Sequence, residues 1–311
     1  MPLQQLKFKP GIDKEATVYS TEGGWYEMDK VRFRAGYPEK IGGWTKLSNN
    51  TFLGVCRSLL SWVTLSQELF TSVGTNIKYY IEQGGIYYDV TPLRTTTAAG
   101  DVTFAAVNGS ATITVTDTTH GATVGDYVTF SDAVSLGGNI TADVLNKEYA
   151  IVTVPTSDTF TITATATANS SDTGNGGSST VGKYQLSVGP SVAVPVSGWG
   201  AGLWGAGVWG TGTINTADLE GIRLWSQGTF GEDLVFGPRG GGLYYFDSSV
   251  GLGTRGVLVS SLGGASNVPT IQNYILVSDS SRFTFCFGAN TLGTSTQDPL
   301  LIRWSDQEDV T

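Results

Sequence analysis

The stretch ELFTSVGTNIKYYIEQGGIYYDV, residues 68–90, decides the fold class. It contains three runs rich in β-branched and aromatic residues, ELFTSVG, IKYYIEQ and GIYYDV, which are separated by turn residues. Side chains of these types suit a pleated sheet, whereas glycine and asparagine suit the turns between strands. The stretch therefore predicts consecutive short β-strands, continuing from an earlier run, SLLSWVTL, at residues 58–65.

A similar unit recurs further along the chain. GGIYYDV at residues 84–90 resembles GGLYYFD at 241–247, and a third set combines NYILVSDSSRFTFCFG at 273–288 with PLLIRWSD at 299–306. Recurring sheets of three or four short strands are how a β-propeller is built. We therefore expect a β-propeller-like domain. Three units are fewer than the four or more blades of a usual propeller. Either the irregular parts contain further blades, or the chain is the front portion of a longer protein. We favour the longer protein.

The composition changes between residues 95 and 181, where aromatic residues become scarce and Thr, Ala, Val and Ser dominate. The alternation in SATITVTD (110–117) and TFTITATATA (159–168) predicts antiparallel strands with one buried face. NSSDTGNGGSST (169–180) has the composition of a flexible linker. We expect a small β-sandwich or barrel inserted into a propeller loop. The predicted domains are 1–94 (N-terminal segment and first propeller part), 95–181 (inserted domain) and 182–311 (Gly/Trp-rich loop and continuation of the propeller).

The overall composition favours an all-β protein with very little helix. Only 14% of the 311 residues are charged, 42 are glycine, and long helical patterns are missing. A formal net charge of −9 repels the phosphate backbone of DNA. The composition therefore disfavours a protein that binds a specific DNA sequence. The N-terminus has no apolar signal core, and no run approaches the length of a membrane span. We expect synthesis in a cytoplasm.

The chain offers little for catalysis or metal binding. Cys56 and Cys286 lie in separate apolar runs, so we expect free, buried thiols. His120 is the single histidine, which cannot assemble a His-based metal site, and its sequence DTTHGATVGD predicts a turn residue. We expect no catalytic residues, no metal and no cofactor.

Two groups of carboxylates are the remaining catalytic candidates, because glycoside hydrolysis needs only two acids. They are Glu232 with Asp233, and Asp306 with Glu308 and Asp309. Adjacent acids on a strand face opposite ways, so we interpret these residues as turn and strand-end positions.

A glycine-rich repeat, SGWGAGLWGAGVWGTGT at residues 197–213, places Trp199, Trp204 and Trp209 five residues apart. A period of five suits no regular element, since it turns each Trp by about 140° on a helix and alternates faces on a strand. The repeat predicts a long loop. Its Trp side chains would dock on a neighbouring subunit, a partner protein or a bilayer, or would cap the edge of their own domain.

One N-terminal segment, residues 23–44, contains an alternating strand. Its two faces comprise Val31, Phe33 and Ala35 on one side, and Lys30, Arg32 and Arg34 on the other. The basic face is either a solvated sheet surface or a docking strip for an acidic partner.

Three phrases carry a resemblance to a known family: YSTEGGWYEMDKVRFRAGYPEKIGGW (19–44), RLWSQGTFGEDLVFGPRGGGLYYFD (223–247) and LLIRWSDQEDVT (300–311). Together they resemble the tail nozzle proteins of short-tailed bacteriophages, also described as packaged-DNA stabilisation proteins. The resemblance implies a propeller-based structural virion protein of the tail, without enzymatic activity and assembled in the host cytoplasm. It further implies a hexameric ring below the adaptor and portal rings that closes the channel for the genome.

The resemblance also suggests partners and a role for the Trp repeat. Implied partners are further copies of the chain, the adaptor and portal proteins, tail fibre or needle proteins, and passing double-stranded DNA that is not read by sequence. An acidic chain suits such a conduit, because a basic lumen would bind the DNA and slow it. Trp199, Trp204 and Trp209 would then pack between subunits or plug the tube.

Two competing hypotheses come from other classes. The first is a tail protein that binds or cleaves host-surface carbohydrate, with the 95–181 domain as its receptor-reading module, since Trp and Tyr also stack on sugars. The second is a membrane-contacting tip, because Trp favours bilayer interfaces. We regard membrane contact as the least favoured of the three.

Overall fold

The computed structural model describes residues 8–15, 17, 19–20, 23–43, 45–46, 48–187 and 224–311. The chain divides into two compact units, Met1–Asn49 and Asn50–Thr311, each of which is described by itself. The regular elements of the described residues are β-strands apart from one four-residue helix, α1 (Ala142–Leu145), and two 3₁₀ turns, η1 (Ser248–Val250) and η2 (Val259–Ser261). The all-β prediction is therefore confirmed.

The first unit contains a hairpin of β1 (Val31–Arg34) and β2 (Tyr37–Lys40), with Arg34 opposite Tyr37. Its two-residue loop has positive φ at both positions, 49° at Ala35 and 84° at Gly36. Such primed turns match the right-handed twist of the strands. Lys30 also has a positive φ of 56°, so the predicted strand was too long. Left-handed backbone at Lys30 and Ala35 limits β1 to the four residues between them.

The second unit begins with an antiparallel sheet, the first sheet, in the order β3-β4-β5-β6. Its strands are β3 (Cys56–Val63), β4 (Leu69–Thr75), β5 (Tyr79–Gln83) and β6 (Ile86–Asp89). The stretch quoted at the start supplies β4, β5 and β6. Gly84 and Gly85, with φ of 60° and 86°, form the two-residue turn between β5 and β6, where side-chain-free residues fit a primed turn.

Two more antiparallel sheets follow later in the chain. The second sheet has the order β16 (Trp225–Phe230), β17 (Asp233–Pro238), β18 (Tyr244–Phe246) and β19 (Val257–Leu258). The third sheet has the order β20 (Tyr274–Val277), β21 (Thr284–Phe287) and β22 (Ile302–Trp304). The glycine pair of GGLYYFD plays a different part from its counterpart, because Gly241 bridges to Gln272 instead of turning a hairpin.

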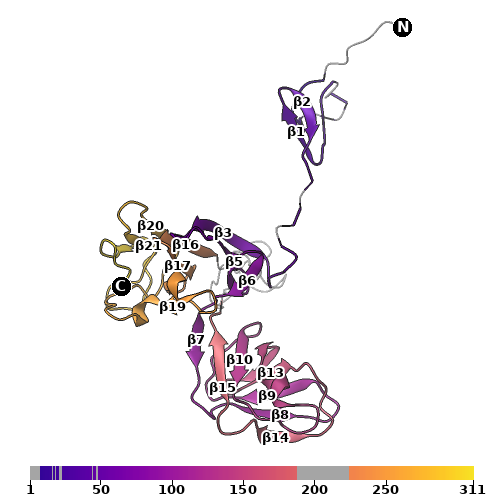
Figure 1. The fold of residues 1–311 in the computed structure, drawn as a ribbon, viewed down its shortest axis with the longest axis vertical. Coiled ribbons are helices and arrows are strands. Elements are labelled where there is room, and N and C mark those ends of the chain that lie inside the picture. The colour runs from indigo at the N-terminus through magenta and orange to yellow at the C-terminus, as the bar shows by residue number, and fades with distance from the viewer. Residues whose placement is uncertain are drawn as a thin grey trace, which may run out of the picture. The chain divides into compact units, whose positions relative to one another are not determined.

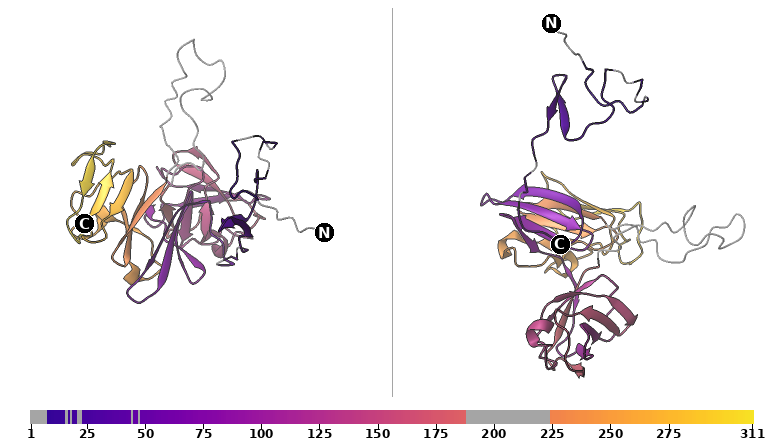
Figure 2. Two further views of the ribbon diagram at one scale, coloured as in Figure 1. Left: turned by 90° about the horizontal axis from the view of Figure 1, so that it is seen from above. Right: turned by 90° about the vertical axis from the view of Figure 1, so that its right-hand side faces the viewer.

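The three sheets stack face to face, with the second sheet in the middle (Figures 1 and 2). Alternate residues of β17 enter two different cores, Leu234 and Phe236 on the side of the first sheet and Val235 on the side of the third. Both faces of the second sheet are consequently buried. Strand alternation thus builds two hydrophobic cores from one strand.

Aromatic residues join the first and second sheets. Tyr79 of β5 stacks on Phe236 of β17 with ring centroids 4.2 Å apart. The indole N–H of Trp225 donates to the carbonyl of Thr75 at 2.7 Å, and that of Trp62 donates to the carbonyl of Glu232 at 2.8 Å. Each Trp therefore buries its apolar surface and satisfies its polar group on the neighbouring sheet.

Residues 93–185 form two further sheets, which we call the two-sheet module, joined to the rest through β7 and β15 (Figure 1). The sheet orders are β11-β10-β15-β7 and β12-β13-β9-β8-β14. The strands are β7 (Leu93–Thr96), β8 (Thr103–Ala106), β9 (Thr112–Thr116), β10 (Tyr127–Ser131), β11 (Glu148–Ala150), β12 (Thr153–Thr156), β13 (Thr159–Thr163), β14 (Asp172–Asn175) and β15 (Val181–Gln185).

The module has one core that draws on both of its sheets. Ile113 and Val115 of β9 are buried while the alternating threonines of the strand face outward, as the alternation predicts. The predicted linker at 169–180 is wrong, because it contains β14, which pairs with β8, and a fully buried Thr180. The Thr180 hydroxyl donates to the carbonyl of Gly176 at 2.6 Å, so a polar, glycine-rich composition here forms ordered backbone.

Candidate functional site

The predicted gating residues Trp199, Trp204 and Trp209 lie outside the described residues. Their proposed role in an intermolecular contact stays a prediction.

The basic residues of the N-terminal hairpin are described, and two of them have acidic neighbours. The Arg32 Nε lies 3.1 Å from the Glu39 carboxylate on β2, and the Lys30 Nζ lies 3.7 Å from Asp29. Arg32 and Arg34 are exposed, whereas Val31 and Phe33 of the opposite face are half-buried. Exposed pairs of this kind contribute little to stability, but they reduce the positive charge that Lys30 and Arg32 could offer an acidic partner.

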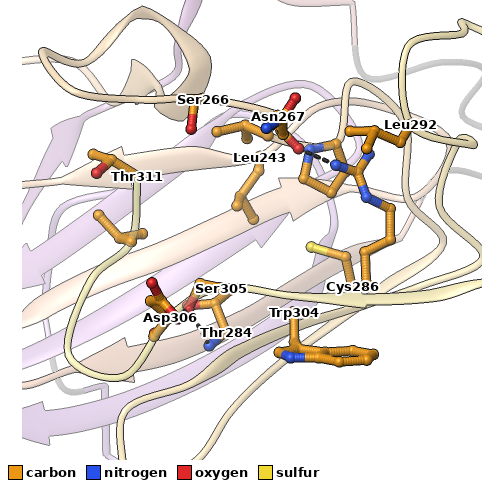
Figure 3. Close-up of a pocket in the computed structure, with 14 residues that line it drawn as sticks. Leu243, Ser266, Asn267, Thr284, Cys286, Leu292, Trp304, Ser305, Asp306 and Thr311 are labelled. Carbon is orange, nitrogen blue, oxygen red and sulfur yellow. Dashed lines mark hydrogen bonds between the residues drawn. The ribbon is translucent and has the colours of Figure 1, made fainter.

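A pocket of about 340 Å³ lies beside the third sheet. Its floor includes Thr284 and Cys286 of β21 and Arg303 of β22, and its rim includes residues 266–269 and Thr311 (Figure 3). Arg303 and Trp304 are consecutive residues of β22, so strand alternation places their side chains on opposite sides of the sheet. Figure 3 shows the Trp304 ring at the margin of the residues drawn. The Trp304 ring therefore lies at the edge of the pocket and not over its centre.

Arg303 ties two loops together at this pocket. Its Nη1 donates to the carbonyl of Asn290 at 3.2 Å, and its Nη2 donates to the carbonyl of Asn267. Within the ranges that the structure describes, no carboxylate forms an ion pair with Arg303. Because a guanidinium has five N–H donors, those not used on the two carbonyls could bind a carboxylate, a phosphate or a sugar hydroxyl.

The pocket has a polar floor but an unreactive thiol. The Thr284 hydroxyl is buried and has no hydrogen-bond partner among the described residues. Burial raises the pKa of the Cys286 thiol to about 12. The positive charge of the nearby Arg303 lowers this pKa but offsets only part of the effect of burial. At neutral pH the thiol is protonated and is a poor nucleophile. The arrangement can bind a small polar group, and Cys286 gives it no thiolate chemistry.

Both cysteines are free thiols, as the sequence predicts. Cys286 is buried, but Cys56 at the start of β3 is only half-buried. Burial also raises the pKa of the Cys56 thiol, and the Ser58 carbonyl that accepts its hydrogen bond is 3.5 Å away.

The candidate carboxylates of the sequence are engaged in local structure. Asp233 accepts hydrogen bonds at 2.8 Å from both the backbone N–H and the hydroxyl of Ser248, and another from the Tyr245 hydroxyl. Glu232 accepts one at 2.9 Å from the backbone N–H of Leu65. These contacts fit the interpretation of strand-end and turn positions.

The second acidic group and the histidine also have local partners. Asp309 accepts from the backbone N–H of Thr311 at 2.8 Å. His120 follows a turn after β9, and its Nδ1 accepts from the backbone N–H of Ala122 at 3.0 Å. The His120 ring is buried and packs edge-on against Phe160. The sequence predicts the turn but not the burial.

A buried ion cluster is the main feature that sequence reasoning missed. The Lys78 side chain is only 2% exposed, and its Nζ lies 2.7 Å from Asp89 and 2.6 Å from Glu148 of the two-sheet module. Arg255 approaches the same carboxylates at 3.5 and 3.8 Å. Gln185 also donates to Glu148. Asp89 is eleven residues from Lys78, but Glu148 is 70 residues away. No local charge pattern could therefore have revealed the whole cluster.

The cluster perturbs the titration of Asp89. Burial raises the pKa of the Asp89 carboxyl, but the positive charges of Arg255 and Lys78 together outweigh burial and hold the pKa below its ordinary value. The cluster is thus a charge-balanced joint between the first sheet and the module. Its four charged groups satisfy one another, which is the arrangement of a structural contact.

Other kinds of site were sought in the same residues. No group of three or more His, Cys, Asp or Glu in the described ranges is placed to hold a metal ion. Among those residues, no helix has the length and apolar character that crossing a membrane requires.

Comparisons with known proteins give little further guidance. No family model matches the chain, and no curated protein matches it. Among solved structures it is similar to one titled "Phage phi92 endosialidase", with 17% identity and a TM-score of 0.25. The similarity covers 81% of this chain and 36% of that one, so the chain spans little more than a third of that protein's length. A TM-score of this size assigns neither fold nor function.

Proposed function

We propose that the chain is a structural protein of a bacteriophage tail, an oligomeric nozzle that retains packaged DNA and conducts it during ejection. The face-to-face stack of antiparallel sheets carries the proposal. Two of the three phrases that resemble the nozzle family, 223–247 and 300–311, supply β16 to β18 and β22 of this stack. The family resemblance therefore falls on the part of the molecule that a propeller would be built from.

We propose in addition that the three stacked sheets are consecutive blades of a propeller. The supporting observation is the second sheet, whose two faces are covered by its neighbours as in an internal blade. The proposed partners are further copies of the chain, the portal and adaptor rings, and tail fibre or needle proteins.

The acidic character of the chain supports a conduit. With a formal net charge of −9, the chain does not attract DNA phosphates at long range, which would let a genome pass without being held. The Asp233 and Asp89 carboxylates are engaged in structural contacts. A structural role uses these contacts directly and needs no catalytic group.

Antibody labelling of virions tests the proposal. An antibody raised against residues 197–213 would be applied to purified particles before and after DNA release, with a capsid antibody as control, and imaged by negative stain. We expect label confined to the tail, and more of it after release if the Trp repeat helps to close the channel. No label on intact or broken particles, together with a positive capsid control, would overturn the virion assignment.

A second measurement tests the carbohydrate hypothesis. The purified chain would be applied to an array of bacterial surface glycans, and bound sugars would be incubated with it to detect cleavage. A nozzle shows neither saturable binding nor cleavage. Saturable binding that survives in residues 92–187 alone, which contain the complete two-sheet module, would replace the nozzle with a receptor-binding tail protein.

A further inference from the structure

The outer side of the third sheet is a continuous apolar surface. In the register of the sheet, Phe287 of the central strand lies between Tyr274 and Ile302, and Phe285 lies between Leu276 and Trp304. We call this surface the outer aromatic face; it comprises Tyr274, Leu276, Phe285, Phe287, Ile302 and Trp304. None of its residues carries a charge. The other side of the same strands, with Ile275, Val277 and Cys286, packs on the second sheet.

The outer aromatic face is open to solvent. Trp304 is 67% exposed, Tyr274 is 56% exposed and Leu276 is 47% exposed. A sheet face with this composition is ordinarily buried against another layer. Large contiguous apolar patches on a soluble protein mark sites of association.

The opposite end of the stack carries a second surface that is largely aliphatic, bordered by the buried Glu82 opposite Thr71. On the outer side of the first sheet, Val63 lies opposite Leu69, and Ser61 lies opposite Thr71. Leu59 is 65% exposed, and Val63 and Leu69 are each 58% exposed. We call this surface the outer aliphatic face; it comprises Leu59, Ser61, Val63, Leu69 and Thr71.

The polar atoms of the outer aliphatic face are already satisfied. The hydroxyls of Ser61 and Thr71 lie 3.0 Å apart and bond to each other. The rest of this side of the first sheet is covered within the chain, where the Phe52 ring contacts the rings of Tyr80 and Tyr87. The uncovered part can therefore be buried by an apolar partner without leaving a hydroxyl unpaired.

We propose that the outer aromatic face binds the outer aliphatic face of a second copy of this chain, head to tail. Such a contact continues the stack, since each internal junction already joins one sheet face to the next through aromatic and aliphatic side chains. One kind of contact covers both end surfaces. Pairing two aromatic faces with each other would leave both aliphatic faces in water. A head-to-tail contact closes a ring when its rotation allows.

This inference deepens the proposed function by naming the surfaces that join the copies of the chain. Its biological role rests on the oligomer of that proposed function. Its test needs no virion. It reads the mass of the purified chain in solution, so a failed antibody experiment and a failed association experiment are distinguishable results.

Sedimentation velocity of the wild type and two variants gives the first measurement. Trp304→Asp inactivates the aromatic face and Leu59→Asp inactivates the aliphatic face, each at a side chain that is about two-thirds exposed. We expect the wild type to form multiples of its 32.8 kDa mass as its concentration rises. Each variant should weaken association at least tenfold. Val107→Asp, at a 64% exposed aliphatic residue of the two-sheet module, is the matched control and should associate like the wild type.

Mixing the two variants gives the decisive measurement. Each variant retains the face that the other has lost, so an equimolar mixture should form a heterodimer and nothing larger. Circular dichroism verifies folding, and Ile302→Lys with Val63→Lys replaces any variant that fails to fold.

Three outcomes would overturn the proposal. The first is a wild type that stays monomeric at all concentrations. The second is undiminished association of Leu59→Asp, which would mean that the aromatic faces pair with each other. The third is a mixture of folded variants that remains monomeric.

Discussion

At the scale of single residues, Lys78 is the most consequential position in the described structure. An almost fully buried ammonium group holds two carboxylates from different parts of the chain, and one of them belongs to the two-sheet module. Burying a charge is unfavourable unless it is paired, so each member of the cluster depends on the others. Substituting one member therefore affects groups that are far from it in sequence.

Replacing Lys78 with methionine should lower the free energy of unfolding by about 3 kcal/mol, because Asp89 and Glu148 would keep their charges and lose their closest cation. Urea denaturation measures the change. Lys183→Met, at an exposed lysine of β15, is the matched control and should change the value by less than about 0.5 kcal/mol. Equal effects of the two substitutions would show that the cluster does not stabilise the fold.

The lowered pKa of Asp89 predicts a pH dependence with a definite sign. A carboxyl whose pKa is lower in the folded state stabilises the protein above its unfolded pKa, near 4, and this stabilisation is lost as the pH falls through the folded pKa. The urea midpoint of the wild type should therefore fall more steeply below pH 4 than that of Asp89→Asn. Parallel curves for the two proteins would contradict the prediction.

The two thiols should differ in reactivity. Cys56 is half-buried, whereas Cys286 is buried and its thiol pKa is raised to about 12. At pH 8 a disulfide reagent should label one thiol per chain in the native state and two in urea. Cys56→Ser should abolish the native labelling. Rapid labelling of Cys286 in the folded Cys56→Ser variant would show that the pocket opens to the reagent.

At the scale of elements, alternation and turn residues made the strands predictable. The second half of β3 and the core strands of the two-sheet module follow the period of two in the sequence. β5 is buried on both faces, and its aromatic and β-branched residues predicted it instead. The segment 169–180 was not predictable, because a strand that pairs through its backbone needs no apolar pattern. The end of β1 at Arg34 was not predictable either, because the alanine at position 35 gives no sequence signal of its left-handed backbone.

The turn between β5 and β6 supplies a test of backbone strain. Gly84 has a φ of 60° and open space where a Cβ would lie, so Gly84→Ala should destabilise the protein by about 1 kcal/mol through strain alone. Gly253 has equally open surroundings without that positive φ, which makes Gly253→Ala the matched control. Thermal unfolding should show a lower midpoint only for Gly84→Ala.

At the scale of the whole molecule, the sequence indicated the units but not their joints. The repeated phrases predicted several similar sheets, and the change in composition predicted a different β-region between them. The contacts that join them come from residues such as Lys78 and Arg255, whose partners are brought near only by folding. The candidate pocket was missed as well, because the lone Arg303 of PLLIRWSD has no motif around it.

The two-sheet module has its own core, so it should fold alone. A fragment of residues 92–187 should unfold cooperatively in urea with a β-sheet circular dichroism spectrum. Phe160→Ala should destabilise the fragment by about 3–5 kcal/mol, since the Phe160 ring is fully buried in that core. A fragment without a cooperative transition would mean that the module depends on the ion cluster for its fold.

The pairing of β7 with β15 has a consequence for how this protein can change over time. The strand that enters the two-sheet module and the strand that leaves it are antiparallel neighbours, with Thr96 opposite Lys183. The first and last strands of the module are therefore neighbours. The module can be lengthened, shortened or exchanged for another without altering the distance between the two ends of the chain that it connects. The module is therefore placed like an interchangeable cassette, on which selection can act while the stacked sheets keep their contacts.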